Sequence, residues 1–189
     1  MLWTKREGEI ALIQDHETHK YDEVERFHGH QCPGLAIGIR ASELALKELG
    51  EGDGDEELVC ISETDMCGID AIQYMTNCTL GKGNLVLHHY GKVAFTFYRR
   101  SDGKGIRMVL RPNLNREMDR EEYRLYLLEA PSEELFELGT PREELPPKAF
   151  RENTLICAGC GEGTMESMTR NMDGEVYCLP CYRERHGER

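Results

Sequence analysis

Four cysteines near the C-terminus constrain the fold of this chain more than any other feature. Cys157 and Cys160 form one Cys-x-x-Cys pair, and Cys178 and Cys181 form a second pair after a gap of 17 residues. A tight turn lets two thiolates bind one ion, and two such pairs complete a tetrahedral set of sulfur ligands. The spacing therefore predicts a structural zinc site without an open coordination position.

Residues 151–189 depend on such an ion for their folding, because so short a segment with few large apolar side chains cannot build a sufficient core. Gly161 follows the first pair, as in a zinc knuckle. Asp173-Gly174 predicts a hairpin turn, and Tyr182–His186 predicts a short helix. Knuckle, hairpin and helix follow one another in a treble clef. Four independent cysteines or a redox dithiol pair are the alternatives.

The zinc module is preceded by a change in composition. Residues 140–148 hold three prolines and several charges, which is typical of a linker. A chain of 189 residues is long enough for one ordinary domain and a small appendage. We therefore expect a core domain over residues 1–150 and a treble-clef zinc finger over residues 151–189.

The overall composition excludes several classes of protein. The formal net charge of -12 argues against a general nucleic-acid binder, because contacts to phosphates need a basic surface. Eight cysteines without an export signal indicate metal or redox chemistry, not a disulfide scaffold. Met1–Glu7 lacks the apolar core of a signal peptide, and no apolar run approaches the roughly 20 residues that span a bilayer. We expect a cytoplasmic protein that does not bind membranes.

The first domain mixes helical and strand patterns, which predicts an α+β core. Residues 22–27 are expected to form only the approach to the first helix. A second helix begins near Cys67, and its buried stripe is expected to consist of Ile69, Ile72, Met75 and Leu80. Arg99–Gly105 resembles a hairpin turn. The other expected helices cover residues 33–49, 119–129 and 132–138, the last capped by Ser132, and the expected strands cover residues 58–62, 85–90, 93–98 and 106–110.

One histidine- and cysteine-containing turn precedes the first of these helices. Pro33 is well suited to the first helical position, which predicts that Cys32 is the N-cap. The positive end of the helix dipole favours thiolate there, and thiolate is the form that ligates metals and attacks electrophiles. His28 and His30 are further candidate ligands or proton carriers.

Cys67 has the same local context, because it too precedes a predicted helix. Two thiols at two helix N-termini can meet at one edge of a sheet, with His30 two residues from Cys32. His28, His30, Cys32 and Cys67 are therefore the candidate ligands of a second metal, zinc or another thiophilic ion. Cys60 and Cys78 are interpreted as small buried hydrophobic residues.

Other polar residues allow two readings each. Lys82 lies between two glycines and either binds an anionic group or belongs to an ordinary turn, since the spacing of a P-loop is absent. His88-His89 lies in a predicted strand, so at most one ring faces any site. Acidic residues around Cys67 either orient ligands and move protons or serve as caps and solvated charges; they are Glu63, Asp65 and Asp70. The catalytic candidates are Cys32, His30, Cys67 and Lys82.

Four ordered blocks between residues 20 and 112 resemble the FmdE family, which is named after a component of formylmethanofuran dehydrogenase. The blocks are Phe27–Leu35, Glu63–Gln73, Thr79–Leu85, and Tyr90–Lys92 with Ala94-Phe95. The zinc module resembles the treble clef that is appended in some members.

The resemblance implies a thioredoxin-like α+β core, with a mixed sheet flanked by helices. It also implies a metal or active site at His28, His30, Cys32 and Cys67. A further implication is association with a molybdenum or tungsten formylmethanofuran dehydrogenase, an enzyme of one-carbon metabolism in anaerobes. The resemblance brings no redox motif, because no Cys-x-x-Cys occurs before residue 157.

Three functions compete at this point. The first is a metal-binding accessory protein with a structural four-cysteine zinc site and a second metal site. The second is an enzyme that uses an open metal position or Cys32 as nucleophile on a small one-carbon or pterin-like compound, with Lys82 holding an anionic group. The third is a scaffold whose zinc finger docks a partner complex. Analogy with similar small domains also predicts a homodimer.

Overall fold

The computed structural model describes residues 21–52, 54–114 and 117–187. The chain divides into two compact units, and the boundary lies between Lys148 and Ala149. The expectation for Met1–Glu7 lies outside the described residues. Among the described helices, none combines the length and the apolar character needed to cross a membrane.

The first unit is built on a five-stranded sheet in the order β2-β1-β3-β4-β5. β1 pairs with β2 in parallel, and the remaining neighbours pair antiparallel, so the sheet is mixed. Helix α4 (Gly68–Thr76) connects the two parallel strands. The prediction of an α+β core with a mixed sheet and flanking helices is confirmed. The strands are β1 (Leu58–Ser62), β2 (Leu85–Leu87), β3 (Ala94–Arg99), β4 (Gly105–Leu110) and β5 (Phe136–Gly139).

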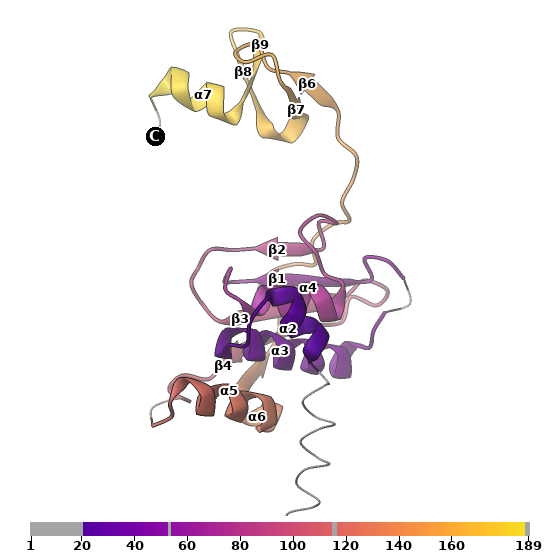
Figure 1. Ribbon diagram of the computed structural model, residues 1–189. Coiled ribbons are helices and arrows are strands. Elements are labelled where there is room, and N and C mark those ends of the chain that lie inside the picture. Colours follow the sequence, from indigo (N-terminus) through magenta and orange to yellow (C-terminus); the bar gives the residue numbers. More distant parts are fainter. Residues whose placement is uncertain (1–20, 53, 115–116, 188–189) are drawn as a thin grey trace, which may run out of the picture. The chain divides into compact units, whose positions relative to one another are not determined.

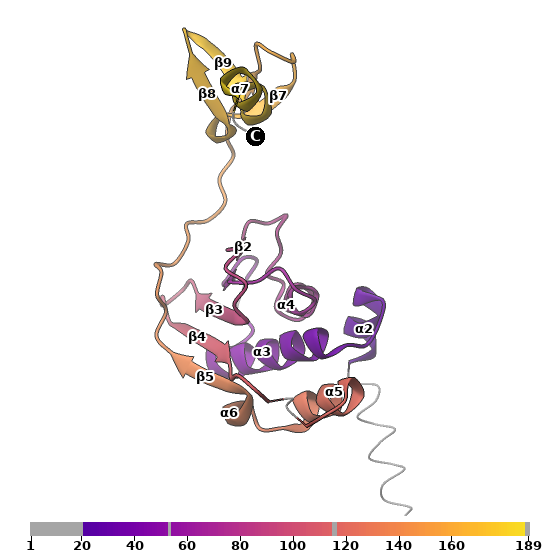
Figure 2. The ribbon, with the colours of Figure 1, turned by 90° about the vertical axis from the view of Figure 1, so that its left-hand side faces the viewer.

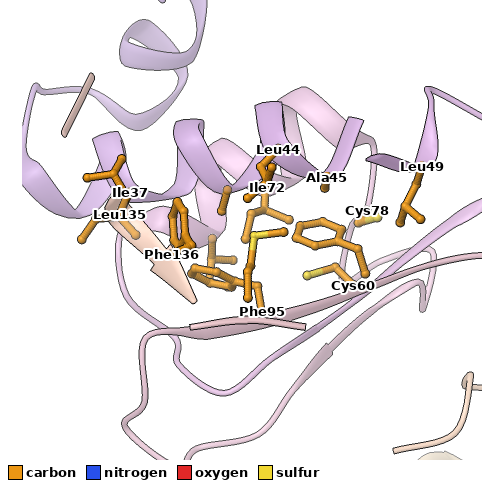
Figure 3. Packing of buried hydrophobic residues seen from close by; sticks show 14 of the residues in the cluster. Ile37, Leu44, Ala45, Leu49, Cys60, Ile72, Cys78, Phe95, Leu135 and Phe136 are labelled. Carbon is orange, nitrogen blue, oxygen red and sulfur yellow. The ribbon is translucent and has the colours of Figure 1, made fainter. Parts of the chain in front are cut away.

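Helices cover one face of this sheet (Figure 2). Side chains in a strand alternate between faces, so Phe95 and Phe97 of β3 both point toward the helices. They belong to one continuous apolar core with Leu44 and Leu49, and Figure 3 shows Phe95 lying beneath the helix that carries these leucines. The helices of this unit are α2 (Asp22–His28), α3 (Pro33–Leu49), α4 (Gly68–Thr76), α5 (Arg120–Glu129) and α6 (Ser132–Leu135).

The opposite face of the sheet carries a smaller apolar cluster. Val59, Ile61 and Tyr98 are buried there, and Leu145 packs against them. The guanidinium of Arg100 also donates to the backbone carbonyls of Pro146 and Pro147, at 2.6 and 3.3 Å. Most of the expected linker over residues 140–148 is therefore packed on the first unit, because its apolar and carbonyl groups complete the second face.

The expected bounds of α3 and β1 agree with the structure, and four other expectations require correction. Asp22–His28 is a helix and not merely an approach to α3. The short helix from Ser132 ends at Leu135, because Phe136–Gly139 pairs with β4, and its N-cap residue is Pro131, not Ser132. β2 ends at Leu87, so His88 and His89 follow the strand. Leu80 lies beyond α4 and is 53% exposed.

The second unit follows the expected order of knuckle, hairpin and helix. β8 and β9 form an antiparallel hairpin whose turn is Asp173-Gly174, with positive φ values of 54° and 85°. Both values are typical of a type I′ turn. The elements of this unit are β6 (Thr154–Ile156), β7 (Gly163–Met165), the 3-10 helix η1 (Glu166–Met168), β8 (Thr169–Met172), β9 (Glu175–Cys178) and α7 (Leu179–His186).

Candidate metal centres

The first unit brings the side chain of Cys67 together with three side chains from the segment 28–32. His28, His30, Cys32 and Cys67 each offer one ligand atom, and these atoms all lie within 4.8 Å of one another. Imidazole nitrogen and thiolate sulfur are the ligands that zinc and other thiophilic ions prefer. The arrangement can therefore hold one metal ion with two sulfur and two nitrogen ligands.

Two helix N-termini position the thiols. Cys32 is the N-cap of α3, and its Sγ accepts a hydrogen bond from the backbone N–H of Leu35 at 3.3 Å. Pro33 follows at the first helical position, where it needs no backbone donor. Cys67 occupies the N-cap position of α4. Both sulfurs thus lie near the positive ends of helix dipoles, which favours negative charge on them.

Glycines allow these two helix ends to approach each other. A Cβ added to Gly38 in α3 would lie 2.5 Å from the Cα of Gly68 in α4, which is closer than real Cβ contacts occur. A Cβ on Gly34 would lie 3.1 Å from the Cβ of Cys67. The Gly34-x-x-x-Gly38 spacing places both glycines on one face of α3. Backbone contact between α3 and α4 therefore brings Cys32 and Cys67 together.

His28 is oriented by a carboxylate. Its Nδ1 lies 2.6 Å from Oδ2 of Asp70, which fixes the ring and leaves Nε2 directed to Cys32 Sγ at 3.8 Å. Metal-binding histidines characteristically use their second nitrogen in this way. α2 is also held against α4 by the ring contact of Phe27 with Tyr74, whose hydroxyl donates to Glu23.

The spacing of His28 and Cys32 fits a tetrahedral ion. Bond lengths of about 2.1 Å to nitrogen and 2.3 Å to sulfur place the two ligand atoms about 3.6 Å apart in ideal tetrahedral geometry. The observed separation is 3.8 Å.

Partial burial, and then the adjacent Cys32 thiol, raise the pKa of the Cys67 thiol above its ordinary value. A bound cation offsets the repulsion between two adjacent thiolates, and the donor set is suited to bind one.

The second unit brings together the four cysteines of the two Cys-x-x-Cys pairs. Cys160 Sγ lies 3.9 Å from Cys178 Sγ, close to the roughly 3.8 Å edge of a tetrahedral zinc–sulfur site. The backbone N–H groups of Cys178 and Gly159 each lie 3.3 Å from Cys157 Sγ. Hydrogen bonds from backbone groups, that of Cys178 first, lower the pKa of Cys157 to about 6, which favours the thiolate.

Gly159 leaves room for the sulfur of Cys181, the fourth of these ligands. A Cβ on Gly159 would lie 3.0 Å from Cys181 Sγ, so a larger residue would push that sulfur away. Tyr177 is buried beside Cys157 and Cys178, and the guanidinium of Arg185 lies 4.4 Å from the centre of its ring. One tyrosine and the sulfurs thus make up most of the small core, as expected for a domain that depends on an ion.

Lys82 does not lie among the ligands of the first unit. Its ammonium donates to Asp55 at 2.9 Å and lines a cavity of about 430 Å³ together with Thr76 and Asn77. Those residues lie at the C-terminal end of α4, whereas Cys67 caps its N-terminus. Nine helical residues span about 14 Å, so Lys82 is remote from Cys67. The expectation that Lys82 supplies an anion contact near Cys32 is wrong.

Most of the other singled-out polar residues have local partners. Glu63 is buried and binds the Arg107 guanidinium at 2.5 Å. His89 pairs with Asp65 at 3.3 Å, and His88 with Glu143 at 2.9 Å, so neither histidine belongs to the metal cluster. Cys60 and Cys78 are fully buried, as expected, and burial raises the pKa of Cys78 to about 11. Both therefore remain neutral thiols.

Sequence reasoning missed two features of the site. It treated Asp70 as one of several acidic residues, although Asp70 is the one that contacts His28. It also overlooked Gly34, Gly38 and Gly68, which set the distance between the helices. The spacing of four residues between Gly34 and Gly38 was visible in the sequence. The contact of Asp70 with His28 could not be predicted without helix α2, which carries His28 and was not expected.

Comparison with known proteins identifies both units. The sequence model of a family described as "FmdE, Molybdenum formylmethanofuran dehydrogenase operon" matches residues 27–143. The model of the prokaryotic dksA/traR C4-type zinc finger matches residues 152–185. Both matches confirm the resemblances seen in the sequence, and the second supports structural zinc at the four clustered cysteines.

Two individual relatives cover different lengths. The crystal structure of a tungsten formylmethanofuran dehydrogenase FmdE-like protein from Syntrophus aciditrophicus is similar with a TM-score of 0.62 and 29% identity, covering 87% of this chain and 91% of that one. A "Probable S-adenosyl-L-methionine-binding protein" from Archaeoglobus fulgidus is 40% identical over 92 residues, 46% of this chain. The chain spans only 25% of the length of that curated relative.

Proposed function

Because this chain belongs to the FmdE family, we propose that it is a metal-binding accessory protein that holds a second ion in its first unit. The ligands are His28, His30, Cys32 and Cys67. The observation that carries the proposal is that four atoms of metal-binding type, three from residues 28–32 and one from Cys67, lie within 4.8 Å of one another. Exposed carboxylates often cluster without an ion, whereas thiolate and imidazole are the ligand types that thiophilic ions prefer.

The surroundings of the cluster support this proposal. Cys32 is held by a backbone N–H, His28 is held by Asp70, and both cysteines cap helices. A thiophilic ion such as zinc supplies Lewis acidity at such a site or is itself the cargo that an accessory protein passes on. The chain's own residues bind this ion, orient one imidazole and keep the sulfurs partly shielded from water.

Metal counting tests the proposal directly. Elemental analysis of the anaerobically purified full chain is expected to give two ions per chain. Cys32→Ser and Cys67→Ser are each expected to lose one ion, and Cys157→Ser the other. Cys78→Ser is the matched control, because Cys78 is buried outside both clusters; it keeps both ions. A wild-type protein with one ion, lost only in Cys157→Ser, overturns the proposal.

We also propose that the accessory role is exercised on a molybdenum- or tungsten-dependent dehydrogenase. Support comes from the descriptions of the family and of the Syntrophus aciditrophicus relative, which both name such an enzyme. Size-exclusion chromatography of the purified chain mixed with a formylmethanofuran dehydrogenase tests this association. Co-elution supports it, and separate elution at micromolar concentrations contradicts it.

A further inference from the structure

The four ligands of the first unit differ in how the protein holds them. Cys32 is buried, caps α3 and accepts the Leu35 N–H at 3.3 Å. His28 has a side chain that is 8% exposed and is bound by Asp70 at 2.6 Å. Cys67 caps α4 next to the glycine contact. Moving any of these three ligands therefore disturbs a helix end or the partly buried pair of His28 with Asp70.

His30 lacks comparable support. It lies in the short connection between α2 and α3 and is exposed. Within the described part of the chain, the ring of His30 makes no hydrogen bond or ion pair, and it lies against the ring of His28 at a centroid distance of 4.4 Å. No carboxylate or backbone carbonyl among those residues orients its second nitrogen, in contrast to His28.

The backbone around His30 is nevertheless anchored. Gly29, with a φ of 92°, closes α2 by donating its N–H to the Glu25 carbonyl at 2.8 Å. On the other side, the side-chain amide Nε2 of Gln31 donates to the Glu25 carboxylate at 2.6 Å, and Cys32 begins the cap of α3. The imidazole of His30 can therefore leave the cluster by rotation of its own side chain, without movement of α2 or α3.

We infer that His30 is a displaceable ligand of the second ion, and that an external nitrogen or sulfur donor binds in its place. The inference rests on the proposed function. Release of His30 leaves two sulfur ligands and one nitrogen ligand on the ion. Three protein ligands and one exchangeable position are typical of catalytic zinc sites. The four-cysteine site of the second unit, in contrast, has no exchangeable position. A donor of the same softness as imidazole or thiolate suits the remaining set.

Cobalt-substituted full-length protein tests the inference, with imidazole as the external donor. His30→Ala is expected to retain the second ion and to show a saturable change in its visible d–d absorption when imidazole is added. His28→Ala is expected to bind the second ion at least about tenfold more weakly than His30→Ala, because it loses an oriented ligand. His89→Ala is the matched control: His89 is exposed and pairs with Asp65 outside the cluster, so this variant is expected to respond as the wild type does, at higher imidazole concentrations than His30→Ala, because imidazole must first displace His30.

Two results would overturn the inference while the proposed function stands. One is loss of the second ion from His30→Ala as complete as its loss from His28→Ala. The other is an absorption spectrum of cobalt-loaded His30→Ala that does not respond to imidazole. The cobalt content of the wild-type protein is measured in the same samples and tests the proposed function separately. Circular dichroism of each variant shows whether it is folded. If His28→Ala does not fold, the imidazole titration of His30→Ala still tests the inference, because it does not use the His28 variant.

Discussion

Gly38 of α3 and Gly68 of α4 lie in backbone contact, and this contact sets the distance between the cysteines that cap the two helices. A side chain on either glycine needs space that the neighbouring backbone occupies. The metal cluster is therefore a consequence of helix packing as much as of its ligands.

Gly38→Ala is expected to destabilise the first unit and weaken binding of the second ion. The added methyl group forces α3 and α4 apart, and overpacking of this kind costs about 1–3 kcal/mol. Urea unfolding and metal titration of the variant measure both effects. Gly139→Ala is the control, because a Cβ at Gly139 meets nothing within 4 Å. Equal stability and metal affinity of the two variants would show that the contact has no role.

Asp70→Asn is expected to lower the affinity for the second ion by roughly 10–100-fold, because it removes the carboxylate that orients His28. Competition with a chelating dye measures this affinity. Asp65→Asn serves as the control, since Asp65 pairs with the exposed His89 and not with a ligand. Unchanged affinity in Asp70→Asn would mean that the His28–Asp70 pair is unrelated to metal binding.

Removal of metal is expected to unfold the second unit selectively. Its small core consists mainly of sulfur ligands and Tyr177, whereas the first unit has an apolar core between helices and sheet. Limited proteolysis after chelation should therefore degrade residues from about Phe150 onward and leave a stable N-terminal fragment. Circular dichroism follows the same change. Identical digestion patterns with and without chelator would contradict this prediction.

Asp102 is expected to stabilise the first unit in a pH-dependent way. The side chain of Arg99 first, and then the Lys104 backbone N–H, lower the pKa of Asp102 from 3.8 to about 2. A carboxyl group with a lowered native pKa contributes stability that is complete above its unfolded pKa and is lost as the pH falls through the native one. The difference in urea midpoint between wild type and Asp102→Asn should therefore be constant above about pH 5 and vanish below about pH 2. A difference that does not change over this range would refute the prediction.

Helices whose ends are marked by nearby proline or glycine residues could be predicted from the sequence. Pro33 after Cys32 and the glycine after Leu49 marked both ends of α3, and the observed helix has these bounds. α2 was missed because it is short and polar, with Val24 as its buried residue. Its terminating glycine, Gly29, was a signal that could have revealed it.

The site was predictable to the extent that it depends on helix starts. Cys32 and Cys67 were paired on that basis, and the structure brings them together. Lys82 was placed wrongly, because proximity along the chain does not show that it lies at the far end of α4. The role of Asp70 was not predictable either, since its partner His28 belongs to the helix that was missed.

Anomalous scattering from crystals of the anaerobically purified protein tests the central claim most directly, because it locates each ion among its ligands. The account predicts two peaks per chain. One should lie among the four clustered cysteines of the zinc finger, and the other about 2.0–2.3 Å from His28 Nε2, Cys32 Sγ and Cys67 Sγ. A single peak in the zinc finger, with no metal between Cys32 and Cys67, would contradict it.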